Sequence, residues 1–301
     1  MNWNLNSGYG AHLANAIMCS RLSGKIFIVG ASGVAYRDQI QQLFQGDVDG
    51  KVRFTATIAA AVALCTASGN DQIMVLPGHT ESVSAAAGIA LSTAGISLIG
   101  LGTGTQRPTI TFDTATTATM TVTAANVTID NFVFTQAFDA IVSPIVVSAA
   151  GFTMKNCYVM TANASYQCTQ FILTTAAANN MTIVNNRFNG TVDAGTTAVI
   201  TIVGGDNAYI ADNDFIGAYT SAVGAIQSIT TLNTNCVIRR NTIVNKTAGA
   251  TKGITLLTGS TGVIAENKFG IGSGAAPITG DAVHWVGNWS AAAVATNGTL
   301  V

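Results

Sequence analysis

The most constraining feature of this chain is a short phrase that recurs six times between residues 126 and 269. The copies read NVTIDNFVF (126–134), GFTMKNCYV (151–159), NMTIVNNRF (180–188), AYIADNDF (208–215), CVIRRNTI (236–243) and GVIAENKF (262–269). They share the order apolar, any, any, Asn, any, apolar or aromatic, with Thr at the opening position of the first two. Their asparagines are Asn131, Asn156, Asn186, Asn213, Asn241 and Asn267, at spacings of 25, 30, 27, 28 and 26 residues. A period of 20 to 50 residues is typical of solenoids, propellers and repeat arrays.

A second β-rich stretch lies between successive phrases. Its copies are TMTVTA (119–124), PIVVSA (144–149), QFILTT (170–175), AVITIV (198–203), AIQSIT (225–230) and GITLLT (253–258). These segments are rich in β-branched residues and bounded by turn residues, as strands are. Sparse Leu argues against a leucine-rich repeat, and a propeller blade of about 40 residues is too long. We therefore predict an all-β fold, a right-handed single-stranded parallel β-helix, over residues 51–290.

The recurring asparagine has a structural explanation in such a fold. Equivalent positions of successive coils lie at the strand spacing of about 4.8 Å, so identical residues stack. Stacked amides can bond to the next coil and to turn backbone, which satisfies polar groups that burial would leave unpaired. Asn also tolerates the left-handed backbone of tight turns. All six asparagines are thus predicted to form a structural ladder.

The entry to the repeats, residues 54–83, has its own pattern. Thr55 or Thr57 can cap a short Ala-rich helix within residues 54–69, which Gly69 can end, and a strand and a Pro-Gly turn follow. Helix, strand, Pro77-Gly78 and the pair Thr80-Glu81 resemble the opening of the pectate-lyase-like β-helix superfamily. The resemblance covers about residues 54–290 and implies a fold, with the helix covering the end of the solenoid, and no particular activity.

The flanks lack the repeat. Residues 1–50 are predicted to be a docking arm or small subdomain, with a strand at 25–29 and a helix at 36–44, and residues 291–301 a C-terminal tail. GASG (30–33) lacks the spacing of a dinucleotide loop. DVDG (47–50) lacks the distal Glu of a calcium loop and is interpreted as a surface turn.

Composition excludes several classes of protein. Only 13 Lys and Arg and 14 Asp and Glu occur in 301 residues, with a net charge of −1, so no nucleic-acid partner is expected. No apolar run approaches the roughly 20 residues of a membrane span. The five cysteines (Cys19, Cys65, Cys157, Cys168 and Cys236) form no CxxC pair and are interpreted as buried thiols. We expect no metal and no cofactor. The N-terminus lacks the pattern of a secretory signal, so synthesis in a cytoplasm is expected.

Enzymatic β-helices need carboxylates that converge on one bond. Asp212-Asn213-Asp214 resembles the acid pair of polygalacturonases, although their Gly-His-Gly and Arg-x-Lys partners are missing. Strand alternation would place Asp212 and Asp214 on one face, with Arg239 one coil further. These three residues are the catalytic candidates if the protein is an enzyme.

Short uncharged repeats behind a non-repeating N-terminal arm resemble the spikes, fibres and head-decoration proteins of tailed bacteriophages. That resemblance implies a non-enzymatic virion structural protein, a capsid decoration or cement protein or a spike. We expect a homotrimer that docks on the major capsid protein or another virion protein through residues 1–50, with no membrane partner. One alternative is a tailspike-type polysaccharide lyase or hydrolase, and a second is a bacterial surface adhesin.

Overall fold

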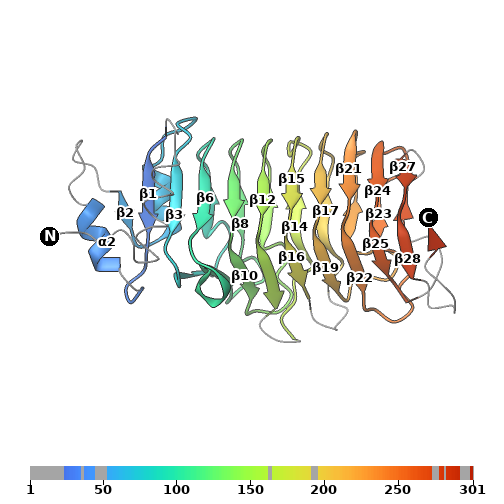
Figure 1. Ribbon diagram of the computed structural model, residues 1–301, viewed down its shortest axis with the longest axis horizontal. Coiled ribbons are helices and arrows are strands. Elements are labelled where there is room, and N and C mark those ends of the chain that lie inside the picture. The colour runs from blue at the N-terminus through green and yellow to red at the C-terminus, as the bar shows by residue number, and fades with distance from the viewer. Residues whose placement is uncertain are drawn as a thin grey trace.

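The computed structural model describes residues 24–34, 37–44, 53–161, 165–190, 196–272, 278–280, 283–291 and 299–300. They form a right-handed parallel β-helix, which confirms the predicted fold class (Figure 1). Each coil visits three parallel sheets in the same order, so that every strand pairs with its equivalents one coil before and one coil after. We name these sheets A, B and C.

The three sheets run along the whole solenoid. In spatial order, sheet A contains β2 (Phe54–Thr55), β1 (Ile26–Val29), β3 (Gln72–Val75), β6 (Ser97–Gly100), β9 (Thr128–Asp130), β12 (Thr153–Lys155), β15 (Thr182–Val184), β18 (Tyr209–Ala211), β21 (Cys236–Arg239), β24 (Gly262–Ala265) and β27 (Val283–Val286). Sheet B contains β4 (Thr80–Val83), β7 (Thr109–Phe112), β10 (Val133–Gln136), β13 (Tyr158–Thr161), β16 (Arg187–Asn189), β19 (Asp214–Gly217), β22 (Thr242–Asn245), β25 (Lys268–Gly270), β28 (Trp289–Ala291) and β29 (Thr299–Leu300). Sheet C contains β5 (Ile89–Leu91), β8 (Met120–Val122), β11 (Ile145–Val147), β14 (Gln170–Thr174), β17 (Ala198–Ile202), β20 (Ile226–Ser228), β23 (Ile254–Thr255) and β26 (Ile278–Thr279).

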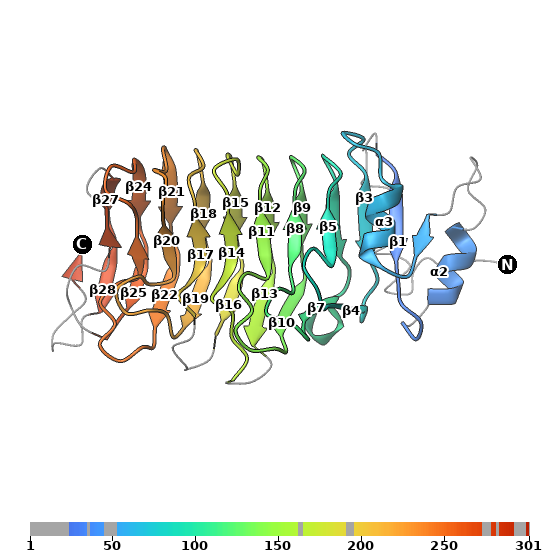
Figure 2. The same cartoon turned by 180° about the vertical axis from the view of Figure 1, so that it is seen from behind.

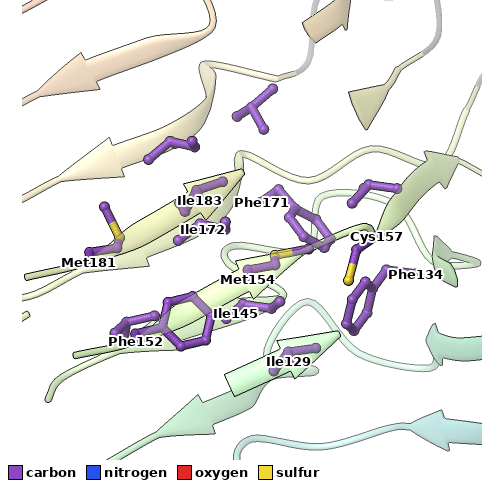
Figure 3. Packing of buried hydrophobic residues seen from close by; sticks show 14 of the residues in the cluster. Ile129, Phe134, Ile145, Phe152, Met154, Cys157, Phe171, Ile172, Met181 and Ile183 are labelled. Carbon is purple, nitrogen blue, oxygen red and sulfur yellow. The ribbon is translucent and has the colours of Figure 1, made fainter. Parts of the chain in front are cut away.

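Strand register stacks apolar side chains into continuous columns inside the solenoid. In sheet A, Ile129, Met154 and Ile183 occupy equivalent positions of three successive coils and are fully buried (Figure 3). In sheet B, the rings of Phe188 and Phe215 stack face to face with centroids 4.9 Å apart. Such columns remove apolar area from water on every coil, and this burial is the dominant stabilising term in folding.

A short helix packs at the N-terminal end of this core. It is α3 (Ile58–Leu64), with Thr57 as its N-cap; the Thr57 hydroxyl accepts a hydrogen bond from the Ala60 N–H at 3.3 Å. The helix is shorter than the predicted 54–69, because Cys65 already has extended backbone and ends it before Gly69. Its buried face joins the core beside β1 and β3 (Figure 2). No described helix is both long enough and apolar enough to cross a membrane.

The N-terminal strand β1 belongs to the solenoid. It lies between β2 and β3 and pairs in parallel with both, while Phe27 and Val29 contribute to the main core. Helix α2 (Arg37–Phe44) follows, and its Ile40 packs against a small apolar cluster on the outer side of this sheet, formed by Ile28, Phe54, Met74 and Leu76. The predicted boundary at residue 50 therefore does not separate an arm from the solenoid, since the apolar KIFIV segment supplies a strand for β3. Residues 1–23 and the DVDG segment (47–50) lie outside the described residues.

The C-terminal end also differs from the predicted boundary at residue 291. Strand β28 reaches Ala291, and β29 pairs antiparallel with it through Trp289 and Leu300. Part of the predicted tail thus forms the last strand of sheet B. Strand β29 pairs with the edge of β28, whose main-chain N–H and C=O groups would otherwise be open to pairing with another chain.

Candidate functional site

The turns from sheet A to sheet B hold a ladder of buried asparagines. Its members are Asn186, Asn213, Asn241, Asn267 and Asn288, all at most 2% exposed. In each step, the backbone N–H and the side-chain Nδ2 of one Asn donate to the Oδ1 of the Asn one coil further, at 2.9–3.0 Å. Each Nδ2 also donates to a main-chain carbonyl of the preceding coil. The ladder thus satisfies buried main-chain groups, so its role is structural.

Two of the six predicted members lie outside this ladder. Asn131 and Asn156 occupy the turn position one residue earlier, with φ of 66° and 55°. In their coils the inward position belongs to Phe132 and Cys157. The ladder is continued there by the Cys157 N–H, which donates to the Asn186 Oδ1 at 2.9 Å. Strand register causes the shift, because β12 pairs Lys155 with Val184 and so aligns Asn156 with Asn185.

The carboxylate of Asp212 is held by an arginine. Asp212 stands in the same left-handed turn column, with φ of 57°, and Arg240 occupies this position one coil further. The Arg240 Nε and Nη2 donate to the two carboxylate oxygens, both at 2.6 Å. These hydrogen bonds, more than the nearby charges of Arg240 and Arg239, hold the pKa of Asp212 below its ordinary value. A carboxyl group that stays ionised in this way is poorly suited to donate a proton.

The other two candidate catalytic residues lie on different surfaces. The turn at Asp212 interrupts the strand, so that Asp214 begins β19 on sheet B and is exposed. Arg239 ends β21 on sheet A, where its Nη2 lies 3.6 Å from the Glu266 Oε2. The alternation that would place Asp212 and Asp214 on one face does not hold across a turn. Asp212 and Arg239 therefore belong to two separate ion pairs, and Asp214 lies on a different sheet from Arg239.

The Thr80-Glu81 motif anchors the N-terminal end. The Glu81 Oε2 accepts a hydrogen bond from the Ile58 N–H at 2.9 Å, at the start of α3. It also lies 3.1 Å from the Nε2 of His79, a buried ring whose Nδ1 accepts from the Ala31 N–H. Because Nδ1 accepts, the ring proton is on Nε2 and is donated to Glu81. This series of hydrogen bonds connects the GASG segment, helix α3 and the first coil, so its role is structural.

A cleft of about 420 Å³ opens on the turns between sheets A and B, near the middle of the chain. It is lined by Arg107, Asn156, Cys157, Tyr158, Asn185 and Arg187. The register places Tyr158 and Arg187 side by side at the starts of β13 and β16. The Arg187 guanidinium lies over the Tyr158 ring, 5.8 Å from its centroid. The sequence analysis did not identify this cleft, because its residues come from three separate coils.

The described cysteines are free thiols. Burial raises the pKa of Cys157, which lies in the wall of the cleft, and of Cys168 to about 12. Cys236 is buried as well, whereas Cys65 is half-buried. Protonated thiols are poor nucleophiles and poor metal ligands. Among the described residues, no group of three or more His, Cys, Asp and Glu side chains is arranged to hold a metal ion.

The comparisons with known proteins give no family assignment. No protein-family model matches the chain, and the search of curated proteins returns no match.

Proposed function

We propose that the protein is a non-enzymatic structural component of a bacteriophage particle, a head decoration or cement protein or a spike, in which copies of the solenoid pack side by side. The observation that carries this proposal is the outer face of sheet C. Its outward column is Ala90, Thr121, Val146, Leu173, Thr201, Gln227, Thr255 and Thr279, one residue from each strand. Six of these side chains are partly exposed, whereas Thr201 and Gln227 are buried within the chain itself. Every member of this column is uncharged.

The two other sheets carry charge at their outward positions. Sheet A holds the Asp130–Lys155 ion pair, and sheet B holds Arg187, Asp214 and Lys268. Moving charged groups out of water is expensive, whereas Thr, Ala and Val are buried at little cost. Sheet C is therefore the face best suited to contact another copy. Three identical chains that each present this face to a common axis form a closed trimer.

The size of this face fits a lateral contact. Eight strands at the spacing of about 4.8 Å make a sheet roughly 34 Å long, in which β5, β8, β11 and β14 carry an uninterrupted run of partly exposed outward residues. Exposed apolar residues extend it at the strand ends, where Ile229 and Leu232 are 37% and 47% exposed. Interfaces between subunits are enriched in such charge-poor surface at their centres.

Docking on the particle is proposed for residues 1–23. Strand β1 and helix α2 are committed to the solenoid, so the segment available for a capsid or other virion protein is shorter than the 50 residues expected from the sequence. This part of the proposal rests on the resemblance in layout to phage decoration and spike proteins.

The alternative of a polysaccharide lyase or hydrolase is less favoured. Its candidate acid, Asp212, forms a bidentate ion pair with Arg240, the Arg239 guanidinium pairs with Glu266, and Asp214 lies on sheet B. General acid catalysis needs a proton on the carboxyl group near the working pH, which this arrangement opposes.

The packing proposal is tested by placing one charge at the centre of sheet C. We expect Val146→Lys to remain folded and to become monomeric in sedimentation velocity, while the unchanged chain sediments as a trimer. Thr153→Lys is the matched control, because Thr153 lies in the same coil on the outer side of sheet A. Trimers of Val146→Lys, or a monomeric unchanged chain at micromolar concentration, would refute lateral packing through sheet C.

The virion assignment is tested on assembled particles. Antibody labelling should decorate heads or tails at regular positions, and the protein should sediment with purified particles. Recovery of the protein only in the particle-free fraction would contradict this assignment.

A further inference from the structure

The cleft between sheets A and B has no part in the proposed packing, which uses sheet C. The geometry points to this cleft as a binding site for one oxyanion, a carboxylate, sulfate or phosphate group. The two arginines that line it, Arg107 and Arg187, approach from coils on either side of Tyr158.

Both arginines lack an acidic partner among the described residues. Arg187 contacts the Tyr158 ring, and Arg107 has its Nε buried with no hydrogen-bond partner in the described part of the chain. A buried donor without an acceptor is costly, and two like charges around one cleft repel each other. An anion between the two guanidinium groups would relieve the repulsion between them.

The neighbouring acids compensate this cationic pair only in part, on the Arg187 side. Asp130 is the nearest acid on the Asn156 side, and it is already paired with Lys155, with 3.3 Å between Nζ and Oδ2. The Asn156 Nδ2 also donates to Asp130. On the other side, Asp214 lies beside Arg187 in register, on the next strand. A bound anion would therefore lie toward Arg107, away from Asp214.

The remaining wall of the cleft suits an oxyanion carried on a small molecule. Two side-chain amides, of Asn156 and Asn185, provide further hydrogen-bonding groups, and Tyr158 provides an aromatic surface. The volume of about 420 Å³ falls in the lower part of the range for small-molecule sites. A guanidinium is planar and offers two parallel donors, which matches the geometry of carboxylate, sulfate and phosphate groups.

Two sources of the oxyanion can be distinguished by titration calorimetry at constant ionic strength, adjusted with sodium chloride. One arm uses inorganic sulfate, and the other uses glucuronate with acetate and glucose as controls. Saturable binding of either sulfate or glucuronate supports the site. Glucuronate binding more tightly than both sulfate and acetate identifies an anion on a sugar ring, and equal affinities identify a free oxyanion.

Three variants connect the binding to the cleft. Arg187→Gln should weaken binding at least tenfold, because a charge-assisted hydrogen-bond pair is lost. Asp214→Asn should strengthen it by about threefold, since a carboxylate beside Arg187, with the same sign of charge as the ligand, is removed in a solvent-exposed setting. Lys268→Gln is the matched control, an exposed cation in the same outward column of sheet B, and should leave the affinity unchanged.

Far-UV circular dichroism must match the unchanged chain for each variant. If neither anion binds saturably, or if Arg187→Gln and Lys268→Gln bind as tightly as the unchanged chain, the proposal is overturned. The proposal of packing through sheet C and the proposal of this binding site can be refuted independently, because the two tests use variants of different residues.

Discussion

Replacing Asn213 by Ala tests the energetic role of the asparagine ladder. The Asn213 Oδ1 accepts from the Asn186 N–H at 2.9 Å, and its Nδ2 donates to the carbonyls of Ile183 and Ala211, both at 2.9 Å. Without the side chain, the Asn186 N–H has no acceptor in a position that is 2% exposed. An unsatisfied buried donor costs about 1–3 kcal/mol, and a small cavity adds to this. We expect a loss of about 2–4 kcal/mol in local stability.

The magnitude is best measured locally, because stacked repeats contact only their neighbours and open in parts. Hydrogen exchange followed by mass spectrometry should show amides in residues 181–190 exchanging about 30-fold to several hundred-fold faster. Amides of β7, three coils away, should keep their rates. Global unfolding curves are less informative here, because long repeat arrays depart from two-state behaviour.

The matched control is Asn156→Gly, an asparagine of the same repeated phrase that lies outside the ladder. Asn156 is exposed and has φ of 55°, a conformation that glycine adopts without cost. Its replacement removes one solvent-exposed hydrogen bond to Asp130, so it should change local stability by less than about 1 kcal/mol. If Asn213→Ala leaves residues 181–190 protected, or if both variants have the same effect, the ladder is not a stabilising element and the reasoning fails.

Three further predictions follow from the same structure. Asp212→Asn should lower the thermal midpoint at pH 7, and its difference from the unchanged chain should shrink as the pH falls below 3.8. Hydrogen bonds from Arg240 depress the folded-state pKa of Asp212 below that ordinary value, so the stabilisation is lost as the pH falls through the folded-state pKa. A difference that stays constant from pH 7 into acid would contradict this. Removal of residues 1–23 should leave a folded, monodisperse solenoid by circular dichroism and gel filtration. Removal of residues 1–50 also removes β1 and exposes the edge of β3, so that chain should be unstable and aggregate. Identical behaviour of the two truncated chains would show that β1 is dispensable. Native Cys157 and Cys168, with thiol pKa values of about 12, should resist Ellman's reagent at pH 8 until denaturant is added, and peptide mapping that finds them labelled at the unfolded rate would refute their burial.

The sequence was sufficient to predict the architecture, because both the repeated asparagine phrase and the β-rich stretches between its copies can be recognised from the order of residues alone. The third strand of each coil lies within the phrase itself, where a two-residue turn separates sheet A from sheet B. That turn explains the two misplaced asparagines. Thr128 and Thr153 open the first two phrases where later copies have an apolar residue such as Ile183, and the pairing of β12 with β15 shows that these copies begin one residue later.

The ladder residue Asn288 was missed for a related reason. It follows Asn267 by only 21 residues, below the range of 25–30 that defined the repeat. The cleft was missed because adjacency between coils depends on a register correct to one residue. With that register, Tyr158 and Arg187 fall on neighbouring strands, and their juxtaposition follows from the sequence. An error of one residue in the register also explains why Arg239 was expected next to Asp212. The residue that pairs with Asp212 from the following coil is Arg240.

The asparagine ladder has a direction, and this bears on how the chain is made. Each amide oxygen accepts from the coil before it, so a coil has its main-chain donor satisfied only when the following coil has docked. Translation delivers coils in that same order, at roughly 5–20 residues per second, so a repeat of 27 residues takes about 1–5 s to synthesise. If coils dock in the order of their synthesis, the main-chain donor of the newest ladder coil is the one that lacks its acceptor, and each ladder coil behind it has this donor satisfied.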